Sequence, residues 1–155
     1  VMLLSIPALA QQTIFVVRHA ERADAGSAGA TMMASDPELS EAGRARAQSL
    51  AAALKDAKIA AIYTTEYKRT RQTAEPLARA LGIEVTVVPA RDTAALVEKL
   101  KGEGNALVVG HSNTVGPIIE RLGVAEPVKL GDEDYDNLFV VVRGEKPTLV
   151  RLHFR

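Results

Sequence analysis

The chain has 155 residues, and its 19 lysines and arginines balance 19 aspartates and glutamates, so the formal net charge is zero. That balance argues against binding to nucleic acid or to an anionic membrane through bulk charge, and the 47% hydrophobic content excludes a disordered chain. The length is that of one domain, and the absence of cysteine excludes disulfides, thiolate metal ligands and a cysteine nucleophile.

The first ten residues, VMLLSIPALA, are uncharged and mostly apolar, and residues 8–10 form an Ala-x-Ala pattern. The run is shorter than the roughly 20 apolar residues that a membrane-spanning helix needs. The pattern is typical of the end of a signal peptide, although an apolar strand would have a similar composition. We therefore expect a single domain over residues 11–155, with no membrane span in the mature chain, that is periplasmic or secreted.

Short apolar runs and longer amphipathic segments alternate from residue 13 onward. Residues 13–18 are β-branched and aromatic, as in a buried strand, and residues 24–36 have the composition of a loop. Ser40 is a suitable N-cap for a helix that extends to about residue 58. A strand at 59–63 and a helix at 67–81 follow. Gly82 would end that helix, and Pro76 would kink it or start a second segment.

The same alternation continues in the second half of the chain. Strands are predicted at 84–88 and 106–109, and helices at 93–101 and 115–122. Two late strands, 139–143 and 149–154, are joined by Gly-Glu-Lys-Pro, which indicates a hairpin. Repeated strand–helix units predict an α/β fold of three layers, with helices on both faces of a mostly parallel sheet and the last two strands as an antiparallel edge.

Polar residues follow three of the predicted strands at the point where each strand ends. Arg18 and His19 end the first, the basic segment 64–73 follows the second, and His111 follows the fourth. Ligands of parallel α/β sheets bind beyond the carboxyl ends of the strands. Histidines and arginines that converge on one rim predict an anion site, most simply a phosphate site.

Four short motifs occur along the chain: RHAE at 18–21, LSEAG at 39–43, KRTRQTA at 68–74 and GHSN at 110–113. In this order they resemble the Arg-His-Gly-Glu signature, the Leu-Thr-x-x-Gly segment, the Arg-Thr-x-Gln-Thr segment and the second-histidine motif of the histidine phosphatase superfamily, branch 1. The resemblance implies a phosphoglycerate mutase-like fold, and the length implies a short member without a large cap insertion.

The resemblance also implies a role for each matching residue. His19 would be the nucleophile that becomes phosphohistidine, and Arg18, Arg69 and His111 would bind the substrate and clamp the phosphoryl group. These residue types suit the chemistry, because a neutral imidazole can attack phosphorus and a guanidinium fork matches phosphate oxygens. Asn113 and Glu21 are further candidate substrate-binding residues. The resemblance implies neither a metal ion nor any other cofactor.

The segment in which the family usually carries a glutamate acid reads VPARDT at 88–93 and contains no glutamate. Asp92 is the nearest carboxylate, and we predict that it protonates the leaving oxygen and then activates water. Asp92 and Asn113 are also good caps for the helices that follow them, and Glu21 is equally suited to orienting its loop. Other candidates for the acid are Glu21 and the cluster of Asp132, Asp134 and Asp136.

Only about four residues separate the predicted third strand from the helix after it, which predicts a shallow, open pocket. An open pocket favours hydrolysis over return of the phosphoryl group, because water is not excluded. We therefore expect a phosphohydrolase that acts on a phosphorylated small molecule or a phosphoprotein. The alternatives are a phosphomutase of the same superfamily and a non-catalytic protein that binds phosphate or another anion.

Overall fold

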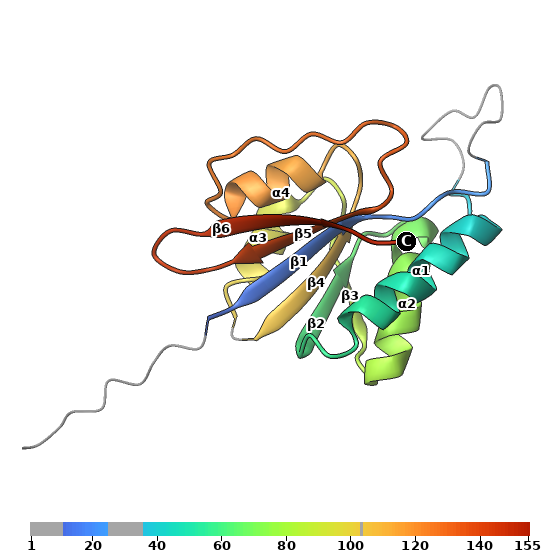
Figure 1. Cartoon of the computed structure of the whole chain (residues 1–155), viewed down its shortest axis with the longest axis horizontal. Helices are drawn as coiled ribbons and strands as arrows, with labels where there is room; N and C mark the ends of the chain where they lie inside the picture. Colours follow the sequence, from blue (N-terminus) through green and yellow to red (C-terminus); the bar gives the residue numbers. More distant parts are fainter. Residues whose placement is uncertain (1–10, 25–35, 103) are drawn as a thin grey trace, which may run out of the picture.

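One six-stranded mixed sheet organises the fold (Figure 1). The computed structural model describes residues 11–24, 36–102 and 104–155, so the predicted signal segment lies outside the described residues. In chain order, the elements of the described residues are β1 (Thr13–Arg18), α1 (Glu41–Leu54), β2 (Ile59–Thr64), α2 (Lys68–Leu81), β3 (Val85–Val87), α3 (Thr93–Lys99), β4 (Asn105–Gly110), α4 (Val115–Arg121), β5 (Asn137–Val142) and β6 (Thr148–His153).

The strands lie in the order β3-β2-β4-β1-β5-β6. The first four along the chain are parallel, while β5 pairs antiparallel with β1 and β6 pairs antiparallel with β5. The predicted α/β class and the antiparallel edge are therefore confirmed. In the pairing of β1 with β4, Arg18 lies opposite Gly110, so the carboxyl ends of these two central strands are level with each other.

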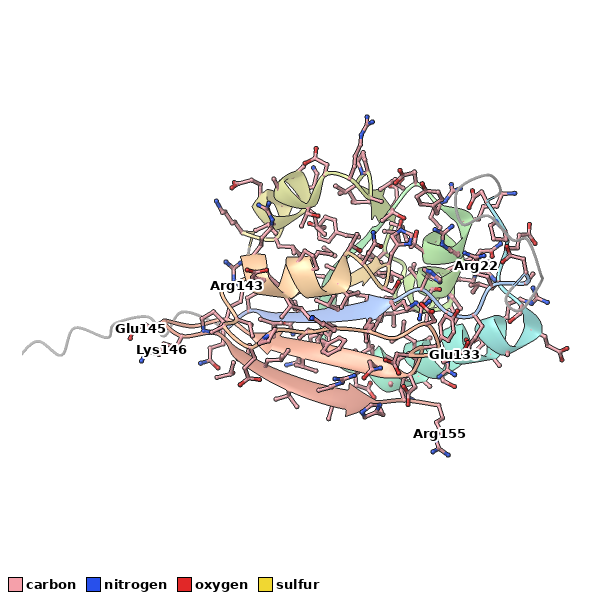
Figure 2. All side chains as sticks on the ribbon, turned by 90° about the horizontal axis from the view of Figure 1, so that it is seen from above. Arg22, Glu133, Arg143, Glu145, Lys146 and Arg155 are labelled. Atoms are coloured by element: carbon pink, nitrogen blue, oxygen red, sulfur yellow. The ribbon has the colours of Figure 1, made fainter. Side chains whose placement is uncertain are left out.

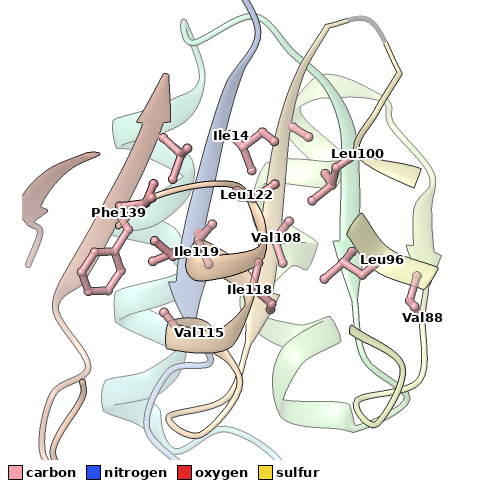
Figure 3. Packing of buried hydrophobic residues seen from close by; sticks show 14 residues of the cluster. Ile14, Val88, Leu96, Leu100, Val108, Val115, Ile118, Ile119, Leu122 and Phe139 are labelled. Carbon is pink, nitrogen blue, oxygen red and sulfur yellow. The ribbon is translucent and has the colours of Figure 1, made fainter. Parts of the chain in front are cut away.

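Helices cover both faces of the sheet, as the alternation of elements predicts. α1 and α2 pack on one face, and α3 and α4 pack on the other (Figure 1). Alternate residues of β1 enter the two layers, with Ile14 and Val16 on the α3–α4 side and Val17 on the α1–α2 side. Figure 3 shows the α3–α4 layer, where Val115 and Ile119 of α4 lie over the strands. Burial on both faces fixes the central strands and hence the residues at their ends.

The helix ends differ from the predictions by a few residues. α1 ends at Leu54, before the predicted residue 58, and Lys58 adopts a left-handed conformation with φ 55° in the turn into β2, which a helix could not include. Gly82 ends α2 with φ 65°, as predicted, and Pro76 lies inside α2 without starting a second segment. No helix among residues 11–24, 36–102 and 104–155 is long and apolar enough to span a membrane.

The start of α1 packs against the chain just after β1. Ser40 caps the helix as predicted, because its side-chain oxygen accepts a hydrogen bond from the Gly43 N–H at 3.0 Å. A Cβ on Gly43 would lie 2.2 Å from the carbonyl oxygen of Glu21, which also accepts from the Ser40 N–H at 2.9 Å. Residue 43 must therefore be glycine if the segment that follows β1 is to keep its place.

We predict that Gly43→Ala lowers the free energy of unfolding by about 1–3 kcal/mol, because the overpacking outweighs the better helix propensity of alanine. Urea denaturation checks this. Gly144→Ala is the matched control, since a Cβ at Gly144 meets no atom within 4 Å. A Gly43→Ala variant as stable as the native protein would contradict the predicted clash.

Candidate active site

Two histidines that are far apart in the sequence face each other at the carboxyl ends of β1 and β4. The backbone N–H of His19 donates to the carbonyl oxygen of Gly110 at 2.9 Å, which extends the strand pairing by one residue. The ring centroids of His19 and His111 are 5.4 Å apart. In Figure 2, Arg22, which follows His19 by three residues, lies with Glu133 at one end of the molecule. Glu145 and Lys146 of the β5–β6 turn lie at the opposite end.

Arg18 and Arg69 complete a buried group of four. The exposed fractions of Arg18, His19, Arg69 and His111 are 8%, 4%, 6% and 6%. Arg18 comes from the last position of β1, and Arg69 from the first turn of α2. The structure therefore brings together the four residues for which the family motifs imply catalysis and binding of the phosphoryl group. Ala20 follows in an ordinary conformation, because Lys58 is the one non-glycine residue with positive φ in the described chain.

The surroundings of His19 determine which ring nitrogen carries the proton. Its Nδ1 lies 2.8 Å from the carbonyl oxygen of Ala20. A carbonyl oxygen only accepts, so Nδ1 carries the hydrogen and the neutral ring keeps a lone pair on Nε2. Burial lowers the pKa of His19 from 6.5 to about 3, and the charges of Arg69 and Arg18 act in the same direction. His19 is therefore neutral near pH 7.

His111 is oriented by hydrogen bonds from two sides. Its Nε2 lies 2.9 Å from Oγ1 of Thr65, and its Nδ1 lies 3.4 Å from a terminal nitrogen of Arg69. A guanidinium only donates, so Nδ1 is the acceptor and Nε2 carries the hydrogen that points to Thr65. Burial and the Arg69 charge lower the pKa of His111 from 6.5 to about 4. Thr65 Oγ1 also lies 2.9 Å from Oγ1 of Thr70, which fixes the hydroxyl.

Both arginines keep buried N–H donors without an acceptor among the described residues. One terminal nitrogen of Arg18 donates to the carbonyl oxygens of Gly131 and Asp132 at 3.1 and 2.9 Å, but its Nε has no partner. Nε and one terminal nitrogen of Arg69 likewise lack a hydrogen-bond partner. A buried donor without a partner costs about 1–3 kcal/mol. An oxyanion between these guanidinium groups would supply the missing acceptors and remove that cost.

Tyrosine rings cover the faces of both guanidinium groups. The guanidinium carbon of Arg18 lies 4.0 Å from the ring centroid of Tyr135, and that of Arg69 lies 4.3 Å from the centroid of Tyr67. A stacked guanidinium remains free to hydrogen-bond in its own plane. The two rings thus help to fix the planes in which the arginines present their N–H groups.

Glu21 lies in an ion pair with Arg46 of α1. One carboxylate oxygen of Glu21 lies 2.6 Å from a terminal nitrogen of Arg46. Burial raises the pKa of the Glu21 carboxyl, but the Arg46 hydrogen bond and charge outweigh it, so the pKa falls below its ordinary value. This contact fits the orienting role that the sequence left open for Glu21, and it ties the segment after His19 to α1.

Asp92 and Asn113 are exposed and lie in the loops after β3 and β4. Asp92 is the N-cap of α3, where its carboxylate accepts from the Ala95 N–H at 3.0 Å. It also lines a cavity of about 20 Å³, room for about one water, together with Thr65 and other residues at the ends of β2 and β4. The residue that precedes α4 as its N-cap is Thr114, not Asn113.

The acidic cluster between α4 and β5 is used mainly for structure. The carboxylate of Asp134 accepts from the Gly131 N–H at 2.6 Å, and Asp136 lies 3.1 Å from the ring of His153. Asp132 contributes its backbone carbonyl to Arg18. Among residues 11–24, 36–102 and 104–155, no group of three or more His, Asp and Glu side chains is arranged to hold a metal ion.

Several contact residues were not predicted as members of the site. Thr73 of α2 accepts at Oγ1 from the Ala20 N–H at 2.9 Å and donates to the Arg69 carbonyl at 2.7 Å. Tyr67 and Asp36 lie against Arg69. Thr73 belongs to a recognised motif, but its hydroxyl gives no signal of a contact 53 residues away. Asp36 falls at the end of a stretch with the composition of a loop, where charge pattern alone predicts no partner.

A sequence model described as the histidine phosphatase superfamily (branch 1) matches residues 14–92, about half of the chain. The chain belongs to this superfamily. The match includes the motifs that carry Arg18, His19 and Arg69, and the buried arrangement described above agrees with it. No curated protein sequence matches the chain significantly.

Solved structures of low sequence identity share the superfamily fold. A proposed alpha-ribazole-5'-P phosphatase from Escherichia coli is 15% identical with a TM-score of 0.75, covering 92% of this chain and 96% of its own. The protein histidine phosphatase SixA, solved with tungstate, is 21% identical with a TM-score of 0.70, covering 91% and 96%. Phosphoserine phosphatase from Entamoeba histolytica, solved with phosphoserine, is 17% identical with a TM-score of 0.68, covering 92% and 96%.

The depressed histidine pKa values predict a loss of stability in mild acid. Between pH 6.5 and about 4 the unfolded histidines take up protons, whereas His19 and His111 stay neutral in the folded state. The stability is therefore present above pH 6.5 and falls as the pH drops, by about 1–2 kcal/mol for each histidine at pH 5. Urea denaturation at pH 7 and pH 5 measures it. His19→Gln should show a smaller drop, and an equal drop would contradict a neutral buried His19.

Proposed function

We propose that this protein is a phosphohydrolase that cleaves a phosphomonoester or a phosphoprotein through a covalent phosphohistidine on His19. The observation that supports this most strongly is that arginine N–H groups without a hydrogen-bond acceptor lie buried close to a neutral histidine. Buried N–H groups of Arg18 and Arg69 without an acceptor in the described chain surround the rim on which His19 lies. A phosphate group supplies the missing acceptor oxygens, and its phosphorus is an electrophile for Nε2.

In the first step, the lone pair on Nε2 of His19 attacks phosphorus, and the bond from phosphorus to the leaving oxygen breaks. The leaving oxygen takes the electron pair and is protonated by a general acid or by water. In the second step, a water oxygen attacks the phosphohistidine, the P–N bond breaks and inorganic phosphate forms, while His19 regains its lone pair. The Nδ1–H bond to Ala20 holds the ring in the same tautomer throughout.

The two arginines would stabilise the transferring phosphoryl group, and His111 would act through its contact with Arg69. Its three equatorial oxygens carry the developing charge, and buried donors whose positions are fixed in advance act strongly on it. Before substrate binds, the backbone carbonyls of Gly131 and Asp132 hold Arg18, and the ring of Tyr67 fixes the plane of the Arg69 guanidinium. Little reorganisation is then needed during the reaction.

Access of water favours hydrolysis over mutase chemistry. β3 ends at Val87 and α3 begins at Thr93, so the connection between them is too short to form an enclosing cap. The named structural neighbours are also phosphatases, and one is solved with tungstate, a tetrahedral oxyanion. These observations support a phosphorylated small molecule or phosphoprotein as substrate, and they favour a phosphatase over a phosphomutase.

One observation favours a second function, a non-catalytic phosphate-binding protein. In the described chain, neither His19 nor His111 forms a hydrogen bond or ion pair with a carboxylate, Glu21 is paired with Arg46, and Asp92 caps α3, so no carboxylate is committed to the role of general acid. Such a protein would retain the clamp of Arg18 and Arg69 but would release no phosphate. Phosphate binding without turnover by the native protein would establish this alternative.

We predict that the native protein hydrolyses p-nitrophenyl phosphate in excess chelator, and that His19→Ala lowers kcat by at least about a thousandfold because the nucleophile is lost. His153→Ala is the matched control, since this third histidine is exposed on β6 and should keep full activity. Phosphate release that survives His19→Ala would sink the assignment of the nucleophile. Activity that disappears with chelator would contradict a metal-independent reaction.

Asp92 requires a separate experiment because it also caps α3. Asparagine caps helices as well as aspartate does, so Asp92→Asn removes the acid and keeps the cap. If Asp92 is the acid, kcat for an alkyl phosphate should fall by about a hundredfold, and the fall for p-nitrophenyl phosphate should be smaller because nitrophenolate needs little protonation. Unchanged rates and an unchanged pH profile for both substrates would leave Asp92 with its capping role alone.

A further inference from the structure

Arg69 is the cation of the site with the fewest hydrogen bonds to hold it. Its guanidinium is buried, and two of its three nitrogens have no hydrogen-bond partner in the described part of the chain. The ring of Tyr67 covers one face, and the third nitrogen lies 3.4 Å from Nδ1 of His111, which is a long contact. Neither contact prevents rotation of the guanidinium within its own plane.

A carboxylate from another segment supplies the missing constraint. Oδ1 of Asp36 lies 4.0 Å from a terminal nitrogen of Arg69, and the same oxygen accepts from the backbone N–H of Lys68 at 2.9 Å. Lys68 is the first residue of α2, and Tyr67, which precedes it, makes no side-chain capping bond. Asp36 therefore satisfies one of the free N–H groups at the start of α2 and faces Arg69 in the first turn of that helix.

The distance of 4.0 Å matters for function. It is too long for a hydrogen bond, so the Arg69 nitrogen keeps its N–H for a ligand, yet it is short enough for attraction in a partly buried setting. Burial and the nearby Arg22 lower the pKa of Arg69, and Asp36 acts in the opposite direction. The negative charge of Asp36 thus partly offsets the cost of burying the charged Arg69 guanidinium.

We propose that Asp36 is a positioning residue, which directs the Arg69 guanidinium toward the phosphoryl group while capping α2. The proposal rests on the proposed function of the site. It makes an unusual electrostatic prediction, because a carboxylate beside a phosphate site repels the phosphate directly. If Asp36 acts only as a cap, removal of its charge should strengthen phosphate binding. If Asp36 positions Arg69, removal of its charge should weaken phosphate binding despite the lost repulsion.

Asp36→Asn separates the two roles, since the amide oxygen still accepts from the Lys68 N–H but carries no charge. We expect the Kd for inorganic phosphate, measured by calorimetry, to rise roughly three- to tenfold, and the KM for p-nitrophenyl phosphate to rise with it. Asp36→Ala loses the cap as well and should also lower Tm. Phosphate binding by Asp36→Asn that is unchanged or tighter than in the native protein would overturn the proposal.

Two comparisons show whether the effect acts through Arg69. In an Arg69→Met background, Asp36→Asn should no longer weaken phosphate binding, because the group that it positions is gone. Weakening of the same size in that background would contradict the proposal. Glu133→Gln removes an exposed negative charge at the end of the molecule where Arg22 lies (Figure 2). It should leave the Kd for phosphate within about twofold of the native value.

A readout that needs neither binding nor turnover distinguishes this proposal from the proposed function. The side-chain Nε–H signal of Arg69 in ¹⁵N NMR, assigned by its loss in the Arg69→Met protein, reports the fixed guanidinium. Asp36→Asn should shift or broaden that signal, and an identical signal would overturn the positioning role. If the native protein neither binds phosphate nor hydrolyses p-nitrophenyl phosphate, the proposed function fails, while this NMR comparison still decides the role of Asp36.

Discussion

A single backbone hydrogen bond, from the His19 N–H to the Gly110 carbonyl, determines the geometry of the site. It extends the parallel register of β1 and β4 beyond the strand ends and holds His19 beside His111, 92 positions away in the sequence. β1 and β4 are central strands with both faces buried, so neither histidine can shift without disturbing the core. The positions of the site residues are therefore fixed by the buried central strands of the sheet.

The same burial sets the electrostatics. Two histidines and two arginines share a small volume, and removal from water disfavours the charged form of the histidines. The arginines stay charged, because a guanidinium is too basic to lose its proton. The result is a neutral histidine beside permanently cationic donors, which is the combination that the proposed phosphoryl transfer needs. The N–H groups left without acceptors are destabilising on their own, and under the proposed function the oxygens of the substrate phosphate would supply the acceptors.

Much of this arrangement could be predicted because it depends on short-range patterns. The apolar run of β1 followed directly by Arg18 and His19 places both residues at a strand end, and the order of the elements brings such ends to one rim. Asp92 was foreseen both as a possible acid and as a cap, and the structure shows the cap. The contacts of Glu21 with Arg46 and of Asp36 with Arg69 could not be foreseen. The partners lie 25 and 33 positions apart in the sequence, beyond the range of a helix or turn contact, and a charged residue gives no sign of a partner at that distance.

The central claim is that His19 carries the phosphoryl group, and a trapped intermediate tests it most directly. Native protein mixed with p-nitrophenyl phosphate and quenched in alkali should contain a base-stable, acid-labile phosphoryl group, which mass spectrometry locates on His19. Because Nδ1 is occupied by its bond to the Ala20 carbonyl, the phosphorus should be attached at Nε2. Phosphate found on His111, on His153 or on a hydroxyl, or turnover without any trapped phosphohistidine, would contradict the account.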